Sequence, residues 1–393
     1  MTMLLLITKI LKEKELDGFI VTNSTNIFYL TGFKGVLPAE RESILVFNPT
    51  PTLITARIYQ NEARRIQSKD LKAKIVNERN QILESVQKLL TKCKRVGFEE
   101  NDLKYGEYQE FKKWLKPIVT DYSSSERSES RSYPKNYNSI NGKFSTSSNN
   151  NKLQLIPTKN LIEDLRVIKT EDEVKRIEKA QIISQNAFDI LVKTIKIDQT
   201  EAEIAEKLAQ IIKSLGANGL AFESIVASGE NSGLPHYATG KKKVKRGEVL
   251  LFDFGTKFQN YCSDLSRTIF IGKANDRQRN IYEHVKKAQS AAIDKISHKI
   301  KASEAYHAAN NVFRKQNLHQ YFLHGLGHGV GLNIHEDPYL RPAIHNPLRD
   351  GMVFSVEPGL YFPWGCVRIE DLIVIENGRA KVLGKLIDEI IEV

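Results

Sequence analysis

The chain has 393 residues, of which 41% are hydrophobic and 27% are charged. This composition is typical of a soluble globular protein, and the length corresponds to two domains at roughly 100–200 residues each. It excludes a fully disordered, collagen-like or coiled-coil chain, and no segment has the ~20 consecutive apolar residues of a membrane-spanning helix. The three cysteines lie far apart and do not indicate a disulfide framework, so we expect a cytoplasmic protein.

Lysine and arginine outnumber aspartate and glutamate by 58 to 47, which gives a formal net charge of +11. An excess of this sign is also found in nucleic-acid-binding proteins. The longest basic block is only Lys241–Arg246, however, and the remaining excess is spread along the chain. We therefore interpret the charge as solvated surface and expect neither a nucleic acid nor a membrane as partner.

Residues 1–122 alternate between helical and strand-like patterns, which predicts a small α/β domain. The pattern contains no cluster of metal ligands or nucleophiles. The predicted elements, in chain order, are a helix over Leu4–Leu16, strands over Phe19–Val21, Ser43–Phe47 and Leu53–Thr55, a helix over Ile82–Leu90 and a strand over Arg95–Phe98.

The segment Ser123–Asn151 contains 10 serines and 6 asparagines among 29 residues and almost no aliphatic side chains. Such a segment buries too little apolar surface to offset its ordering entropy. We therefore predict a linker or surface insertion at residues 123–152, between an N-terminal domain at 1–122 and a second domain at 153–393.

Helices come early in the second domain and strands late, without a steady strand–helix alternation, which predicts an α+β domain around an antiparallel-rich sheet. Thr170 with Glu173, and Thr200 with Glu203, have the spacing of capping boxes at two helix starts. The predicted elements are a helix over Thr170–Lys193, a helix from Thr200 to about Leu215, strands over Ser224–Ala227, Glu248–Phe254 and Tyr261–Ile271, a helical block over about Asp276–Gln316, and strands with Gly-rich turns over His324–Glu392.

Two aspartates stand in apolar strands of this domain. Asp253 lies within Val249-Leu-Leu-Phe-Asp-Phe-Gly255, and Asp264 lies in a second strand-like run. A strand–turn–strand hairpin would bring the two carboxylates side by side, where they would repel each other unless a cation lay between them. Asp264 alone could cap a turn, but a buried unpaired charge at Asp253 would be costly.

Further ionisable residues follow in the same domain. The segment from His324 to Pro338, HGLGHGVGLNIHEDP, contains His324, His328 and His335 among four glycines. Glu357 ends an apolar strand, and Glu370 lies in Val367-Arg-Ile-Glu-Asp371, which also reads as a strand. A single buried acid often pairs with a buried arginine, but four acids with one Gly-flanked histidine favour a metal site.

Asp253, Asp264, Glu357 and Glu370 together carry a charge of −4, which two divalent cations would neutralise. Hydrolases with two metals hold them roughly 3.5–4 Å apart and activate a bridging water molecule. Oxygen-rich ligands with a single histidine suit Mn²⁺ or Co²⁺ and leave Zn²⁺ open as an alternative.

These residues, with the segments HGLGHGVGLNIHEDP, EPGLY and RIED, make the chain resemble the proline-specific metallopeptidases of the pita-bread fold, aminopeptidase P and prolidase. The resemblance runs from about Asn160 to the C-terminus. It extends more weakly to Asn26–Phe33 in the first domain. It implies a ribonuclease-H-like α/β domain of the creatinase N-terminal type, followed by a pita-bread catalytic domain.

The resemblance also implies the roles of individual residues. Asp253 would bind one metal, Asp264 and Glu370 would bridge both, and His328 and Glu357 would complete the ligand set. Glu357 would also act as the base. His236 and His335 would stabilise the oxyanion and position the scissile carbonyl. Arg368 would orient the ligand carboxylates, and His324 matches a histidine that lies outside the ligand set.

We therefore expect an Xaa-Pro aminopeptidase with two divalent metal ions per subunit, acting on peptides with proline at the second position. The alternative is an Xaa-Pro dipeptidase, which would need a residue that grips a free carboxylate; the sequence identifies none. A methionine aminopeptidase and a metal-free binding module are less favoured. The family habit implies a homodimer or larger assembly, with a monomer as the alternative.

Overall fold

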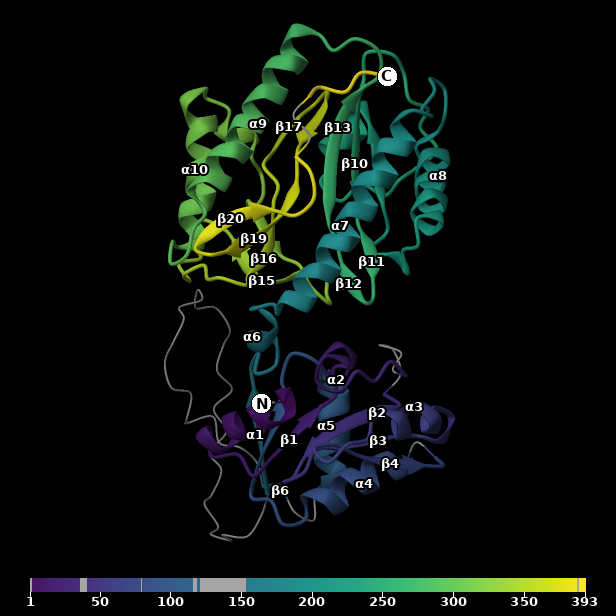
Figure 1. The fold of residues 1–393 in the computed structure, drawn as a ribbon, viewed down its shortest axis with the longest axis vertical. Helices are drawn as coiled ribbons and strands as arrows, with labels where there is room; N and C mark the ends of the chain where they lie inside the picture. Colours follow the sequence, from purple (N-terminus) through teal and green to yellow (C-terminus); the bar gives the residue numbers. More distant parts are fainter. Residues whose placement is uncertain (1, 36–40, 79, 116–118, 121–152, 387–388) are drawn as a thin grey trace. The chain divides into compact units, whose positions relative to one another are not determined.

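The computed structural model describes residues 2–35, 41–78, 80–115, 119–120, 153–386 and 389–393. The chain divides into two compact units, Met1–Ile162 and Glu163–Val393 (Figure 1). The segment predicted as a linker, residues 123–152, lies outside the described residues. No helix in the described ranges is long and apolar enough to cross a membrane.

The N-terminal unit is built on a mixed seven-stranded sheet with the order β4-β3-β2-β1-β5-β7-β6. β1 pairs antiparallel with β2 and parallel with β5, which places it at the centre of the sheet. The strands are β1 (Gly18–Val21), β2 (Ser43–Phe47), β3 (Thr52–Ala56), β4 (Lys72–Val76), β5 (Arg95–Glu99), β6 (Val119–Thr120) and β7 (Leu153–Thr158). The helices are α1 (Met3–Glu13), α2 (Ser24–Thr31), α3 (Gln60–Arg65), α4 (Asn80–Leu90) and α5 (Tyr105–Leu115).

Each helix and strand predicted for the first domain is present in this unit, with two differences. The first helix ends at Glu13 rather than Leu16, because Glu15 has a left-handed backbone conformation with φ of 55°. The predicted domain boundary at residue 153 also differs from the observed division. Residues 153–158 form β7, which pairs in parallel with β5 and so belongs to the N-terminal sheet.

The second unit is an α+β structure in which the ladders between its named strands are antiparallel, as predicted. The strands are β8 (Gly219–Leu220), β9 (Ile225–Ser228), β10 (Val249–Phe254), β11 (Thr256–Phe258), β12 (Tyr261–Cys262), β13 (Leu265–Phe270), β14 (Gly327–Gly329), β15 (Glu336–Leu340), β16 (Val353–Val356), β17 (Gly359–Phe362), β18 (Gly365–Arg368), β19 (Asp371–Glu376) and β20 (Arg379–Val382). The helices are α6 (Glu163–Arg166), α7 (Glu171–Val192), α8 (Glu201–Ser214), α9 (Asp276–Lys295) and α10 (Ala302–Lys315).

Two helix pairs flank the strands of this unit (Figure 1). Phe188 of α7 and Leu208 of α8 share one buried cluster with Phe252 of β10. α9 and α10 contribute to a second cluster, with Phe313 packed in the same core as Phe354 of β16. The helices thus cover the outer faces of the sheets, and each pair buries its apolar side against a different set of strands.

The helix starts at Thr170 and Thr200 have the predicted capping boxes. The predicted helical block over Asp276–Gln316 is instead two helices, α9 and α10. The chain between them leaves the helical conformation at Ile296, and Lys299 has a left-handed backbone with φ of 73°. The amide of Lys299 donates to Leu348 O, so tertiary pairing fixes the break.

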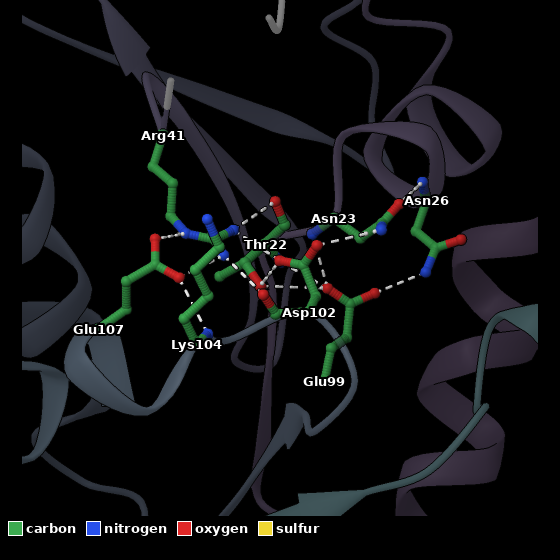
Figure 2. A network of polar contacts seen from close by, with 8 residues as sticks. All are labelled: Thr22, Asn23, Asn26, Arg41, Glu99, Asp102, Lys104 and Glu107. Atoms are coloured by element: carbon green, nitrogen blue, oxygen red, sulfur yellow. Dashed lines mark hydrogen bonds and ion pairs between the residues drawn. The ribbon is translucent and has the colours of Figure 1, made fainter. Parts of the chain in front are cut away.

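A polar network in the N-terminal unit fixes the start of α2 (Figure 2). Glu99 at the end of β5 is buried, and its Oε2 accepts hydrogen bonds from the backbone amides of Thr22 (2.6 Å) and Asn23 (2.7 Å). Its Oε1 accepts from the amide side chain of buried Asn26 (2.6 Å). Asn26 is the first residue of the segment Asn26–Phe33, which resembles the peptidase family. Its side chain bonds to buried Glu99, so this contact contributes to the packing of the N-terminal unit.

Arg41 extends the network to α5. Its Nε lies 2.5 Å from Glu107 Oε1, and its Nη1 lies 2.5 Å from Asp102 Oδ2. The hydrogen bond from Arg41 and the amide of Lys104 outweigh the opposing effect of burial and lower the pKa of Glu107 to about 2. This ion pair therefore stabilises the folded state fully only at a pH above the ordinary glutamate pKa.

We predict that Glu107→Gln lowers the melting temperature of the full-length protein at pH 7. The difference from the unaltered protein should shrink as the pH falls from about 5 towards 2, because the carboxylate is then protonated in the unfolded and finally in the folded state. Calorimetry at several pH values measures this. Glu110→Gln, at an exposed position of α5, is the control. A destabilisation that does not depend on pH would contradict the ion-pair explanation.

Candidate active site

One pocket of about 470 Å³ in the second unit is lined by every residue that the sequence singled out for chemistry. The pocket is partly open to solvent, and its lining combines acids, histidines and a buried arginine. The predicted site residues that line it are Asp253, Asp264, His328, Glu357, Glu370, His236, His324, His335 and Arg368. The fold therefore brings them together from segments up to 134 positions apart, between His236 and Glu370.

The two aspartates come from neighbouring antiparallel strands. Asp253 lies in β10 opposite Ser266 of β13, and Asp264 directly precedes β13. The predicted hairpin therefore exists. The predicted strand over Tyr261–Ile271 does not run unbroken, because residues 263 and 264 separate β12 from β13. This break allows the Asp264 side chain, 5% exposed, to reach the pocket.

His328 and Glu357 reach the pocket from the paired strands β14 and β16. A Cβ atom at Gly327 would lie 1.9 Å from Ser355 O, so only glycine allows the two strands to approach this closely. Ser355 Oγ accepts from the His328 amide and donates to Glu357 Oε1, each at 3.1 Å. The apolar neighbours of Glu370 had predicted that it lies within a strand. In the structure it lies between β18 and β19.

Ligand atoms of Asp264, His328 and Glu370 lie within 4.8 Å of one another. His328 Nε2 is 3.5 Å from Asp264 Oδ2 and 3.5 Å from Glu357 Oε1. His328 Nδ1 lies 3.1 Å from Gly329 O and must donate a proton to it. The lone pair of Nε2 therefore faces the carboxylates, which is the orientation of a metal-binding histidine.

Burial raises the pKa of Asp264 and Glu370 well above the usual range, and neighbouring carboxylates raise both further. Burial also raises the pKa of Glu357 and lowers that of His328. Asp264 Oδ1 and Glu370 Oε1 are buried and have no hydrogen-bond partner among the described residues. Unpartnered carboxylate oxygens in a negatively charged pocket fit divalent cations, which would neutralise the charge and accept these atoms as ligands.

Arg368 at the end of β18 is linked by hydrogen bonds to the carboxylates of Asp253 and Glu370. The arginine side chain is 4% exposed, and its Nη2 lies 2.5 Å from Asp253 Oδ2. Its Nε donates to Ser266 Oγ at 2.9 Å, and that hydroxyl donates to Glu370 Oε2 at 2.7 Å. Arg368 thus orients Asp253 directly and Glu370 through Ser266.

His324 is linked to the acidic cluster through Tyr361 and Arg368. Its Nδ1 donates to Gly325 O at 2.7 Å, so its Nε2 accepts from the hydroxyl of Tyr361 at 3.0 Å. Tyr361 in turn accepts from Arg368 Nη1 at 2.7 Å. This chain of hydrogen bonds gives His324 a supporting position outside the candidate ligand set.

The two other histidines lie nearer to the open side. His236 is exposed in the loop after the 3₁₀ turn Gly229–Gly233. His335 directly precedes β15, and its ring centroid lies 4.2 Å from that of His328. Burial and the neighbouring His328 lower the pKa of His335, which favours a neutral ring that can donate one N–H.

Four residues of the site were missed by reasoning from the sequence, among them Ser266 between Arg368 and Glu370. Tyr361 ends the quoted segment EPGLY and Ser355 lies two positions before Glu357, but their polar contacts depend on the strand pairing. Arg341 lines the open pocket with its guanidinium carbon 4.7 Å from the ring centroid of Tyr339. Nothing in its sequence surroundings indicated this position.

Comparison with known proteins gives matches to both units. Residues 175–377 match the model of metallopeptidase family M24, and residues 4–127 match that of the creatinase/prolidase N-terminal domain. The chain is 31% identical to an Xaa-Pro dipeptidase of Pyrococcus horikoshii over 98% of its own length and 97% of that protein.

Solved structures extend the similarity to the whole fold. An Xaa-Pro dipeptidase from Bacillus anthracis superposes with a TM-score of 0.85 at 28% identity, covering 99% of each chain. An X-Pro aminopeptidase from Thermotoga maritima gives 0.80 at 27% identity, covering 96% of this chain and 98% of its own. The predicted fold, a creatinase-type N-terminal domain followed by a pita-bread domain, is confirmed.

We predict that Mn²⁺ raises the melting temperature of chelator-treated protein by about 5–10 °C at a concentration of 100 Kd, because the cation relieves repulsion between buried carboxylates. Asp264→Asn should lose most of this shift and most of the bound metal. Thermal unfolding and elemental analysis measure the two effects. Asp189→Asn, exposed on α7, should respond as the unaltered protein does. An Asp264→Asn variant with a full shift would contradict the metal site.

Proposed function

Because the chain belongs to metallopeptidase family M24, we propose that it is an Xaa-Pro dipeptidase, which splits dipeptides with proline at the second position. The aminopeptidase activity preferred from the sequence is not confirmed. The relative from Pyrococcus horikoshii, similar over nearly the whole chain, is named a dipeptidase, and so is the Bacillus anthracis structure. These names support the alternative, although an X-Pro aminopeptidase has a similar fold.

The observation that carries the proposal is the place of Arg341. It lines the same pocket as the acidic cluster, against the ring of Tyr339. A dipeptide ends in a free carboxylate one residue beyond the scissile bond, whereas a longer peptide has a neutral amide there. A guanidinium at the pocket wall can form a charge-assisted hydrogen bond only with the former. A pocket of about 470 Å³ also suits a small substrate.

We assign the ligands as the resemblance implies. Asp253 would bind one cation, Asp264 and Glu370 both, and His328 and Glu357 would complete the set. Two divalent cations held there would make a water molecule more acidic and polarise the scissile carbonyl. Mn²⁺ suits four carboxylates with one imidazole, and Co²⁺ and Zn²⁺ are alternatives.

The chain's own residues would then handle protons and orientation. Glu357 would lie beside the water molecule, where its carboxylate could accept a proton from water and return it to the leaving proline nitrogen. His335, as a neutral ring, and His236 would donate hydrogen bonds to the carbonyl oxygen as it gains charge. Arg368 would hold Asp253 in place throughout.

A substrate comparison tests the activity. We predict that the Mn²⁺-loaded protein hydrolyses Ala-Pro with a higher kcat/KM than Ala-Pro-Ala and does not hydrolyse Met-Ala. Arg341→Met should lower kcat/KM for Ala-Pro by about 10- to 100-fold, the effect of losing one hydrogen bond to a charged group, and change that for Ala-Pro-Ala little.

Arg349→Met, an exposed arginine outside the pocket lining, is the matched control for Arg341→Met. Faster turnover of Ala-Pro-Ala than of Ala-Pro would instead restore the aminopeptidase interpretation. Equal losses of kcat/KM for Ala-Pro and Ala-Pro-Ala in Arg341→Met would show that Arg341 does not bind the free carboxylate of the dipeptide.

Histidine variants separate catalysis from metal binding. His335→Ala and His236→Ala should retain metal and lower kcat about 10²- to 10³-fold, because each removes a hydrogen bond made mainly in the transition state. His328→Ala should lose metal first and recover part of its activity in excess Mn²⁺. Metal content and kcat are measured together. If His335→Ala loses metal while His328→Ala keeps it, the roles of the two residues are reversed.

A further inference from the structure

A buried ion cluster lies directly beside His335, and the mechanism described above does not use it. Glu336, the first residue of β15, places Oε2 2.6 Å from Arg166 Nη2 and Oε1 2.7 Å from Lys169 Nζ. The side chains of Glu336, Arg166 and Lys169 are 10%, 4% and 1% exposed. Arg166 ends α6 and Lys169 lies just before α7, so the cluster joins β15 to the first helices of the same unit.

Burying the three charged groups of this cluster costs desolvation free energy. Burial opposes the charged form of Glu336, but the two cations outweigh it and lower the pKa of its carboxyl group. Buried ion pairs often contribute little net stability, because desolvation offsets their attraction. What such a cluster does supply is a fixed geometry, since each charge must stay beside its partner.

The turn that leads from His328 to His335 packs against this carboxylate. A Cβ atom at Gly331 would lie 2.2 Å from Glu336 Oε1, so a larger residue there would displace the Glu336 carboxylate from its present position. Gly331 O accepts from the amide of Cys262 at 2.8 Å, and Gly331 N donates to Asn333 O at 3.0 Å. The turn therefore bonds on one side to the backbone of Cys262 in β12 and packs on the other side against the Glu336 side chain.

Fixing Glu336 also fixes the direction of its neighbour. His335 lies in the bend that directly precedes β15 and is joined to Glu336 by one planar peptide unit, so the position of the Glu336 backbone limits that of His335. The Glu336 side chain points to the buried cations, whereas that of His335 lines the pocket, with its ring beside that of His328. The His335 ring makes no hydrogen bond to the described residues, so its orientation depends on the backbone that carries it.

We propose that Glu336, clamped by its two cations, is a positioning residue that directs His335 towards the substrate. The inference rests on the role proposed for His335 in the function above. It adds that this role requires the ion cluster, and that Arg166 and Lys169 act on turnover without touching the substrate.

A double-mutant cycle between positions 335 and 336 tests the proposal, with Ala-Pro as substrate and Mn²⁺ present. Glu336→Gln should lower kcat by about 10-fold with little change in KM or metal content. In a His335→Ala background the same change should alter kcat less than about 2-fold, because no ring remains to be directed. A merely structural role would give equal losses in both backgrounds.

Lys169 offers a second variant that does not depend on the folding of Glu336→Gln. Lys169→Met leaves a neutral pair of Arg166 and Glu336, and we expect kcat to fall by about 3-fold. Lys169→Arg restores the cation and should restore kcat. Val285→Ala, which removes a buried core contact in α9, is the control for loss of stability and should leave kcat unchanged.

Three results would overturn the inference. The first is an equal loss of kcat from Glu336→Gln with and without His335. The second is loss of metal in Glu336→Gln or Lys169→Met, which would place the cluster in support of the ligands. The third is an unchanged kcat in His335→Ala alone, which would also overturn the role proposed for His335. The first two leave the proposed dipeptidase activity intact.

Discussion

Repulsion between buried carboxylates is the constraint on which the catalytic unit depends. Asp264 and Glu370 lie almost entirely out of solvent, with Asp253 and Glu357 in the same pocket. Arg368 supplies one positive charge, which is too little for four acids. The shifted pKa values and the two unpartnered oxygens follow from this imbalance, and cations would resolve both.

The strand pairing explains how one chain can assemble such a site. Antiparallel ladders bring Asp253 next to the start of β13 and bring His328 next to the end of β16. Gly327 and Gly331 allow the close approaches that these ladders and the following turn require. Polar side chains such as Ser355 then link neighbouring candidate ligands, which restricts their orientation in the structure without a cation.

The sequence indicated the acidic residues because Asp253, Glu357 and Glu370 lie in or at the end of apolar runs, where a charge is costly, and Asp264 lies in a strand that can pair with that of Asp253. It predicted the capping boxes at Thr170 and Thr200 because their signal is local. The start of the second domain was predicted too early, at residue 153. The sequence of β7 does not indicate that this strand pairs with β5 of the N-terminal sheet. The break after α9 was missed for the same reason, since it depends on contacts with a distant loop.

Residues that act through pairing across the fold could not be predicted. Arg341 and Glu336 look like ordinary surface charges in the sequence, and only the structure shows that one lines the pocket and the other lies between two buried cations. In the proposed function, the preference between a dipeptide and a longer peptide depends on Arg341. The fold and the candidate ligands are therefore easier to infer from the sequence than the substrate.

The most direct test of the account is anomalous diffraction from crystals of the protein soaked in Mn²⁺, recorded at the manganese absorption edge. Under this account, two anomalous peaks appear in the pocket, both in contact with Asp264 and Glu370, with His328 Nε2 bound to one of them. A pocket without anomalous signal at saturating Mn²⁺, or peaks that avoid Asp264 and Glu370, would contradict it.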